Sequence, residues 1–217
     1  MQSLALTNLV ADYGEERVLG PLDLELEPGD HVALVGKSGA GKSTLLSLMH
    51  QRWRSRGVSL MPQDLGLVPS LSVFHNVFMG ALARHASWYN LVSLLKPFQR
   101  DIQAITPLLE QLDMADKCWA PTGELSGGQR QRVAAARAIY QGSDLLLADE
   151  PASALDGPMA ERVMQALTRA HPTAVLALHD IDLALRFSTR VVGIADGRIA
   201  LDQPGNRVTS QDLAALY

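Results

Sequence analysis

The sequence has very little cysteine, few aromatic residues and no excess of positive charge. Its one cysteine, Cys118, cannot form an internal disulfide, which indicates a reducing compartment and excludes a disulfide-stabilised secreted fold. Lys and Arg number 19 against 23 Asp and Glu, so the net charge of −4 offers no basis for a nucleic-acid surface. Aromatic residues make up only 5% and apolar residues 47%, a balance typical of a soluble α/β protein.

Long apolar runs are missing as well. No stretch approaches the ~18 residues that a membrane-crossing helix needs. The first 17 residues lack a basic leader, an apolar core and a small-residue cleavage site. We therefore expect a cytoplasmic protein whose membrane role, if any, comes through a partner, and the length of 217 residues predicts a single domain over residues 1–217.

The apolar pattern predicts an α/β fold with a mainly parallel sheet. Alternating apolar residues predict short antiparallel strands within residues 4–13 and 18–30. Continuous apolar runs separated by helix-patterned segments predict buried parallel strands. These runs lie within residues 31–36, 58–64, 144–150 and 174–180.

The middle of the chain has a different pattern. From Ser70 to Gly123 the periodicity is helical, and we expect a helical lobe over about residues 70–140, inserted between two core strands. Residues 191–202 predict a hairpin that turns at Asp196-Gly197, and residues 210–217 predict a short helix.

The motif GKSGAGKS, Gly36 to Ser43, follows an apolar strand and opens a helix, which is the context of a phosphate-binding loop. Glycines let successive backbone N–H groups face an anion, and the helix N-terminus adds its dipole. Lys42 is expected to reach the β and γ phosphates, and the Ser43 hydroxyl to ligate Mg²⁺. The expected nucleotide-binding residues here are Gly36, Lys37, Ser38, Gly39, Ala40, Gly41, Lys42, Ser43 and Thr44.

A second acidic element follows the apolar strand of LLLADE. Asp149 at the strand end is expected to hold Mg²⁺, as the second acidic element of phosphate-loop NTPases does. Glu150, one residue further, is placed to accept a proton from the attacking water.

The segment LSGGQ, residues 125–129, distinguishes among nucleotide-binding families. Together with GKSGAGKS, the glutamine of MPQD, LLLADE, SALD and the histidine of ALHD, it gives an ordered set of motifs over nearly the whole chain. In this set the sequence resembles the ATP-binding cassette (ABC) family, the motor subunits of ABC transporters. The resemblance implies the ABC ATPase fold, namely a P-loop NTPase core with a small antiparallel β lobe and an inserted helical lobe, with ATP and Mg²⁺ as cofactors.

The resemblance also assigns LSGGQ a role in a neighbour's site. Ser126 and the amides of Gly127 and Gly128 precede a helix expected from about Gln129 to Tyr140, so the segment is a second anion-binding helix start. In the family this start faces the γ-phosphate of ATP held by the other subunit of a head-to-tail pair. Glycine permits that close backbone approach, and we include Ser126, Gly127, Gly128 and Gln129 among the nucleotide-binding residues.

Four more residues take roles by resemblance alone. Tyr13 is similar to the family's adenine-stacking aromatic, with a simple turn residue as the alternative. Gln63 is similar to the glutamine that reaches Mg²⁺ and the attacking water. His179 is similar to the switch histidine that contacts the γ-phosphate and holds Glu150, so the expected catalytic set is Glu150, His179, Gln63 and Lys42, and the metal set Ser43, Gln63 and Asp149. Asp156 of SALD resembles the residue that communicates across the dimer.

Two features lie outside the motifs. Arg130, Arg132 and Arg137 fall on the helix after LSGGQ and are interpreted as a solvated or dimer-facing surface. Only about twenty residues separate Lys42 from Gln63, fewer than is common in the family, which puts the size of the β lobe in question.

The helical-lobe segments 67–82 and 87–95, together with 179–199, resemble ATP-binding subunits of phosphonate and related oxyanion importers. The resemblance implies a second ABC ATPase subunit in a homodimer, a membrane permease and a solute-binding protein. It also implies that the chain is peripheral on the inner face of the membrane and has no nucleic-acid partner. The alternatives are an exporter or lipoprotein-release ATPase, a soluble ABC protein acting on ribosomes or DNA, and a nucleotide-binding regulator without turnover. The regulator would be expected to lack Glu150 or His179.

Overall fold

The computed structural model describes residues 3–14, 16–214 and 216. Its strands form a two-stranded and a six-stranded sheet. They are β1 (Leu4–Tyr13), β2 (Glu16–Leu26), β3 (His31–Val35), β4 (Val58–Met61), β5 (Leu145–Asp149), β6 (Thr173–Ala177), β7 (Arg190–Ala195) and β8 (Arg198–Pro204).

The helices alternate with the strands of the larger sheet. The α-helices are α1 (Lys42–Trp53), α2 (Val73–Phe78), α3 (Ser87–Leu95), α4 (Gln99–Gln111), α5 (Gly127–Gln141), α6 (Gly157–Ala170), α7 (Ile181–Phe187) and α8 (Ser210–Ala214). The 3-10 helices are η1 (Arg54–Arg56), η2 (Met79–Arg84), η3 (Ala115–Lys117), η4 (Thr122–Glu124) and η5 (Gly205–Arg207). Within the described ranges, no helix is both long and apolar enough to cross a membrane.

The six-stranded sheet has the order β4-β5-β6-β3-β7-β8. Its neighbours pair in parallel except β7 and β8, which form the antiparallel hairpin expected from the sequence. β5 and β6 are buried along their whole length, which explains their uninterrupted apolar sequences. The carboxyl ends of β3, β5 and β6 therefore lie at the same edge of the sheet, where the motif-bearing loops begin.

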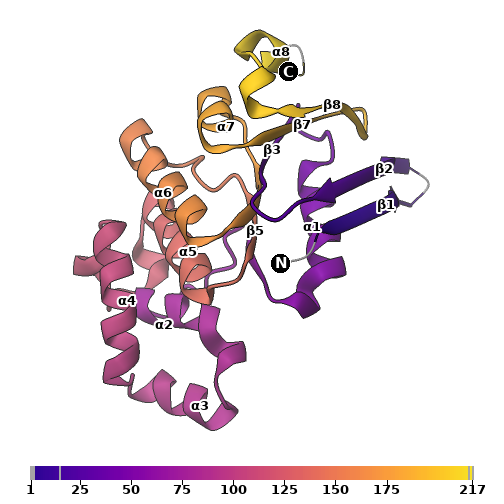
Figure 1. Ribbon diagram of the computed structural model, residues 1–217. Coiled ribbons are helices and arrows are strands. Elements are labelled where there is room, and N and C mark those ends of the chain that lie inside the picture. The colour runs from indigo at the N-terminus through magenta and orange to yellow at the C-terminus, as the bar shows by residue number, and fades with distance from the viewer. Residues whose placement is uncertain (1–2, 15, 215, 217) are drawn as a thin grey trace.

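Two apolar layers cover the sheet. Alternate residues of β3 point to opposite faces, so Ala33 and Val35 pack in one cluster with α2, α4, α5 and α6, while Val32 and Leu34 pack in the other with α1 and the β1-β2 pair. Burial of each such Leu or Val contributes about 1.5–3 kcal/mol. The sheet is thus held between a helical layer and a layer made of α1 with the small sheet (Figure 1).

The two smaller parts of the fold flank this core. β1 and β2 pair antiparallel and form a β lobe of two strands among the described residues. The segment between β4 and β5 contains α2, α3, α4 and α5, and Figure 1 shows α2, α3 and α4 projecting away from the six-stranded sheet. These features confirm the expected P-loop NTPase core with a mainly parallel sheet, a small antiparallel β lobe and inserted helices.

Candidate nucleotide-binding and hydrolytic site

The phosphate-binding loop connects β3 to α1 and depends on glycine at several positions. Gly36, Gly39 and Gly41 have φ values of 141°, 83° and 103°, in the region that other residues rarely adopt. A Cβ at Gly36 would lie 2.2 Å from the carbonyl oxygen of Ile194, so the loop also packs tightly against β7. Around Gly39, by contrast, a Cβ would meet no described atom within 4 Å, which leaves room for an anion in front of the loop.

Lys42 lies inside this loop. Its Nζ donates hydrogen bonds to the carbonyl oxygens of Gly36 at 2.6 Å and Lys37 at 3.1 Å, while the third ammonium N–H can serve an anion. Burial lowers the pKa of Lys42, and the nearby carboxylates of Glu150 and Asp149 oppose that shift. The carboxylates therefore favour the charged form of a lysine that the fold has partly desolvated.

A cavity of about 280 Å³ joins the loop to the other motifs. It brings together residues that lie far apart in the sequence and that the motifs predicted as binding or catalytic. They are Ser38, Gly39, Gly41, Lys42, Ser43, Thr44, Gln63, Glu150 and His179, with Val18 from β2 completing the lining. Lys37 and Ala40, with Ser38 and Gly39, also line an adjoining cavity of about 620 Å³ beside β2 and the β7-β8 turn.

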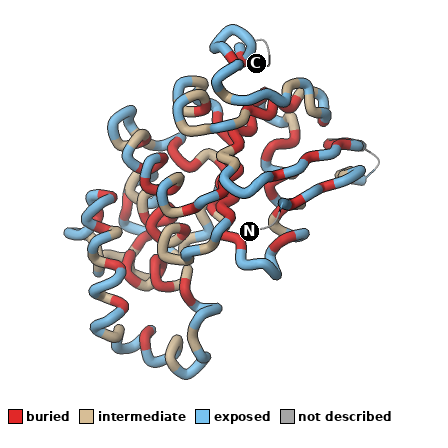
Figure 2. Tube along the Cα trace, in the orientation of Figure 1, coloured by how far each residue is buried: buried red, intermediate tan, exposed pale blue. Residues whose placement is uncertain are grey.

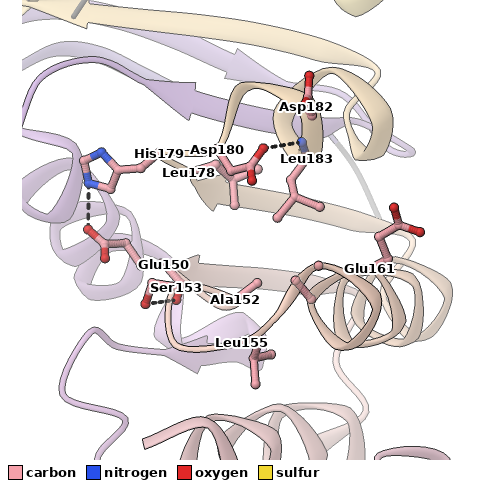
Figure 3. A pocket seen from close by; sticks show the side chains of 12 residues that line it. Glu150, Ala152, Ser153, Leu155, Glu161, Leu178, His179, Asp180, Asp182 and Leu183 are labelled. Carbon is pink, nitrogen blue, oxygen red and sulfur yellow. Dashed lines mark hydrogen bonds and ion pairs between the residues drawn. The ribbon is translucent and has the colours of Figure 1, made fainter.

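The two acidic residues after β5 take different environments. Asp149, the last residue of β5, is buried with 7% of its surface exposed. Glu150 leaves the strand with φ 52°, and its N–H donates to the carbonyl of Ala177 at 3.0 Å, which turns its side chain toward the loop after β6. There the Glu150 Oε1 lies 2.7 Å from the His179 Nε2, and Figure 3 shows the two side chains pointing toward each other.

The donor set fits a magnesium ion. Ser43 contributes a hydroxyl, Gln63 an amide oxygen and Asp149 a carboxylate, and hard oxygen donors are those that Mg²⁺ prefers. No cluster of three or more His, Cys, Asp or Glu side chains suited to a metal occurs among the described residues. The fit is therefore to an ion that takes a few protein oxygens and completes its shell with phosphate oxygens and water.

Gln131, which the sequence analysis did not single out, fixes the loop that follows Glu150. It lies on α5 with 3% of its surface exposed. Its Nε2 donates to the Glu150 carbonyl at 2.6 Å, and its Oε1 accepts from the Ala154 N–H at 2.8 Å. A polar residue on the buried face of a helix was the available signal, but the partner loop lies about twenty residues away and could not be identified from spacing.

The LSGGQ segment begins α5 away from the chain's own phosphate loop. α5 starts at Gly127, two residues earlier than expected, because Ser126 and Gln129 form a capping box in which each side chain accepts from the other residue's N–H. A Cβ on Gly128 would lie 2.9 Å from the carbonyl oxygen of Ala154, whereas a Cβ on Gly127 would make only an ordinary contact. Ser126 and Gly127 are exposed, and no described residue of 125–129 lines the phosphate-loop cavity.

Two further predicted residues, Asp156 and Tyr13, are not placed at the phosphate-loop cavity by the described side chains. The Asp156 side chain caps α6 by accepting from the Met159 N–H at 3.1 Å. Tyr13 ends β1, but its side chain lies outside the described residues, so adenine stacking stays a prediction.

The interpretation of the α5 arginines as a solvated or dimer-facing surface is wrong for two of the three. Arg132 donates to the carbonyls of Leu112 at 2.9 Å and Asp113 at 2.6 Å, with 13% of its side chain exposed. Arg137 donates to the carbonyls of Leu65 and, at 2.6 Å, Gly66. Both guanidinium groups satisfy turn carbonyls of the chain itself, contacts between segments far apart in sequence that charge patterning does not reveal.

Comparison with known proteins gives consistent relatives. The ABC transporter family pattern matches residues 19–57 and 48–153. The phosphonates import ATP-binding protein PhnC of Pseudomonas putida KT2440 is 37% identical, with 94% of this chain and 86% of that protein covered. A PhnC of Pseudomonas aeruginosa PAO1 is 39% identical, covering 93% and 85%. A bacterial ABC transporter cassette with a dimeric structure is 25% identical, with a TM-score of 0.80 over 92% of this chain and 97% of that one.

Proposed function

Because this chain belongs to the ABC transporter family, we propose that it is the ATP-hydrolysing motor subunit of an importer for phosphonate or a related phosphorus oxyanion. ATP hydrolysis is the activity expected of the family, and the chain has the ATPase cassette fold. The observation that carries the proposal is the Glu150–His179 pair at the cavity of the phosphate-binding loop. The substrate class is supported by the names of the relatives, which are phosphonate import proteins.

The chain's own residues divide the chemistry among them. The loop amides and Lys42 bind the β and γ phosphates, which fixes the γ-phosphoryl group in front of Glu150. Glu150 accepts a proton from the attacking water, and His179 holds the carboxylate in place through the 2.7 Å contact. When bound, Mg²⁺ neutralises phosphate charge, and Ser43, Gln63 and Asp149 are the residues that would hold it.

Two copies of the chain complete each site in this proposal. The exposed N-terminus of α5, with the amides of Gly127 and Gly128, would face the γ-phosphate bound by the other copy, because it lies away from the cavity of its own chain. Asp156 would lie near the same interface. ATP then favours the closed dimer, and loss of the γ-phosphate lets the dimer open.

The other partners are a membrane permease and a solute-binding protein. The permease would hold the cassette on the inner face of the cell membrane and convert dimer closure into transport. No described residue is assigned to the transported oxyanion, because the nucleotide motor need not touch it.

The primary test is substitution of Glu150. Glu150→Gln keeps the shape of the side chain but removes the base, so we expect hydrolysis to fall by about two to four orders of magnitude. With ATP and Mg²⁺ the variant should elute from gel filtration as a dimer. Glu161→Gln is the matched control, since Glu161 pairs with Arg186 and lies on α6, on the opposite side of the pocket in Figure 3 from Glu150 and His179, so turnover should be unchanged.

Companions identify the transport direction. Glu150→Gln, isolated from native membranes with ATP and Mg²⁺, should bring down a permease and a solute-binding protein, both identifiable by mass spectrometry. A permease with a large periplasmic domain and no binding protein would contradict import. An unchanged monomer with ATP would contradict the motor mechanism itself.

A further inference from the structure

Helix α3 has its apolar face turned to solvent. Trp88, Leu91 and Leu95 are 66%, 65% and 84% exposed. Their spacing of three and four residues places them on one face of the helix. The opposite face is polar and turned inward, with Ser93 fully buried and the Tyr89 hydroxyl donating to Asp101 at 2.6 Å. A helix on the surface of a soluble protein normally turns its apolar face to the core, and α3 does the opposite. Exposed apolar clusters of this kind mark interaction surfaces.

The inverted helix lies at the far end of the inserted helical segment. In Figure 1 it is the element farthest from α8, and in Figure 2 its trace is mostly exposed. Val92 and Leu94 widen the apolar face, at 40% and 48% exposure. The surface is therefore accessible on a part of the molecule that protrudes from the core.

The charge of this segment is one-sided. Residues 65–100 contain no Asp or Glu, although the whole chain carries 23 of them and a net charge of −4. The same segment supplies Arg84, Lys96 and Arg100, all exposed and flanking α3. Arg84 and Arg100 lie over the rings of Tyr140 and Tyr89, at 5.0 and 5.2 Å, which holds their charges beside the helix.

We propose that α3 is an interfacial helix that docks on the anionic inner surface of the membrane. A Trp and Leu face flanked by Lys and Arg is the composition of helices that lie in the plane of the lipid headgroups. Anionic headgroups attract Arg84 and Lys96, whereas the charge of Arg100 is partly offset by Asp101, whose Oδ1 lies 3.6 Å from the Arg100 Nε. Asp101 itself is buried, so no acidic side chain of residues 65–101 faces the lipid. The α3 surface therefore binds the bilayer directly, in addition to any contact that the cassette makes with a permease.

Charge also argues against a permease loop as the occupant of this face. Cytoplasmic loops of membrane proteins carry an excess of Lys and Arg. A cationic surface without acidic residues would be repelled by such loops, whereas it complements anionic lipid. The lipid surface is thus the better match for the exposed face of α3.

The inference extends the proposed function, since a motor seated on a permease is already close to the membrane. It is tested on the chain alone, without permease or ATP. Failure of vesicle binding would therefore overturn the docking of α3 and leave the ATPase proposal standing. Failure of hydrolysis would overturn the ATPase proposal and leave the docking of α3 standing.

The test uses vesicle binding reported by Trp88. In a Trp119→Phe background the remaining tryptophans are Trp88 and Trp53, and Trp53 is 4% exposed. Titration with vesicles of phosphatidylglycerol and phosphatidylcholine should shift the emission to shorter wavelength, and the protein should sediment with the vesicles. Vesicles of phosphatidylcholine alone should bind at least tenfold more weakly.

Two substitutions separate the apolar and the electrostatic contributions. Leu91→Ser with Leu95→Ser should abolish vesicle binding while leaving ATP hydrolysis and the unfolding midpoint unchanged, because both side chains are largely exposed. Lys96→Glu should weaken binding about 25-fold, at about fivefold for each unit of charge near an anionic surface. Arg198→Glu makes the same change of charge on the exposed β8 and should have no comparable effect.

Three outcomes would overturn the proposal. One is the absence of any sedimentation or emission shift with anionic vesicles. Another is equal weakening by Lys96→Glu and Arg198→Glu, which would indicate attraction by overall charge alone. The third is self-association without ATP that Leu91→Ser abolishes, since it would show that a second copy covers the face.

Discussion

At the scale of single residues, the two glycines that begin α5 differ in what surrounds them. A Cβ on Gly128 would meet the Ala154 carbonyl at 2.9 Å and the Leu155 side chain at 3.2 Å, both within the same chain. A Cβ on Gly127 would come no closer than 3.8 Å to any described atom. The chain itself therefore requires a glycine at position 128 and leaves room for a methyl group at position 127.

This difference gives a test of the composite site. Gly127→Ala should leave the free energy of unfolding of the isolated chain within about 0.5 kcal/mol of the parent, because its methyl group makes only an ordinary contact. It should nevertheless reduce ATP turnover about tenfold or more, because the methyl group intrudes on the approach to a neighbour's phosphate. Thermal unfolding and steady-state hydrolysis measure the two effects.

Gly128→Ala is the matched comparison. Overpacking against the chain's own Ala154 should cost about 1–3 kcal/mol of stability, which the same unfolding assay detects. Full activity in Gly127→Ala would contradict the approach of a second subunit to this helix start.

Motifs predicted the residues that line the cavity of the phosphate-binding loop, and not those that hold the surrounding loops in place. Lys42, Glu150 and His179 occur in short patterns whose chemistry is tied to position in the sequence, and the structure brings them to one cavity. Gln131 and Arg137 act through backbone carbonyls, which every residue possesses. Because a carbonyl leaves no mark in the sequence, only the folded chain reveals these contacts.

At the scale of elements, Arg137 joins α5 to the turn that carries Gln63. The turn closes with a hydrogen bond from the Leu65 N–H to the Pro62 carbonyl at 2.9 Å. Leu65 and Gly66 both have positive φ, at 62° and 54°, so their carbonyls point in directions that ordinary turns do not give. The guanidinium of Arg137 binds both carbonyls and stabilises this conformation.

Loosening the turn of residues 62–66 should impair the positioning of Gln63 toward Mg²⁺ and the attacking water more than it weakens ATP binding. For Arg137→Ala we expect kcat to fall about tenfold with a smaller change in KM, and a higher Mg²⁺ concentration to be required for half-maximal turnover. Arg137→Lys should recover part of the activity, since an ammonium can still donate to the carbonyls. Steady-state kinetics with varied ATP and Mg²⁺ measures each quantity.

A purely structural role for Arg137 would give another pattern. In that case the unfolding midpoint of Arg137→Ala would fall while the kinetics and Mg²⁺ dependence of the remaining folded protein matched the parent. Arg169→Ala, at an exposed arginine on α6, serves as the control and should change neither.

The starts of the helices show which local sequence signals predict a helix boundary. α5 begins at Gly127, two residues before the expected position, and α6 begins at Gly157. The preceding Ser126 and Asp156 provide the caps, and glycine after a cap hides the apolar periodicity by which a helix is recognised. Capping chemistry therefore places these boundaries better than periodicity does.

At the scale of the whole molecule, His171 ties two helices of the core together. It follows α6 and is fully buried, with its Nδ1 2.9 Å from the Leu167 carbonyl oxygen and its Nε2 3.2 Å from the Ala138 carbonyl oxygen on α5. Burial lowers the pKa of His171 below its ordinary value of 6.5, although the two carbonyls act in the opposite direction. The folded chain therefore holds this imidazole neutral at pH values where the unfolded chain protonates it.

The sign of the resulting pH dependence follows from linkage. Above pH 6.5 both states are neutral at His171, and the contribution to stability is fully present. As the pH falls below 6.5 the unfolded state binds the proton first, so stability is lost, by up to about 1.4 kcal/mol per pH unit. His171→Gln should be less stable at pH 7.5 but should lose less stability between pH 7 and 5.5, as measured by denaturant unfolding at each pH. Equal slopes in the variant and the parent would rule out His171 as a source of the dependence.

The sequence predicted the class of the fold better than its connectivity. Apolar runs located each strand of the larger sheet, yet the order β4-β5-β6-β3-β7-β8 places β3 between β6 and β7, whose residues lie more than a hundred positions further along the chain. No local pattern specifies which buried strand lies beside which. The inverted α3 likewise lies in a region expected to be helical, but its outward apolar face is evident only from the surrounding structure.

Through Gln131, α5 connects the two nucleotide sites of the proposed dimer. The helix begins at Gly127, where a second copy's nucleotide is proposed to sit, and one turn later it grips the loop of its own Glu150. If the nucleotide of the second copy displaces α5, the displacement therefore also moves the loop of Glu150, the proposed base for the chain's own nucleotide. The dimer should consequently behave as a cooperative enzyme, with a Hill coefficient for ATP above one that returns toward one when Gln131 can no longer grip that loop.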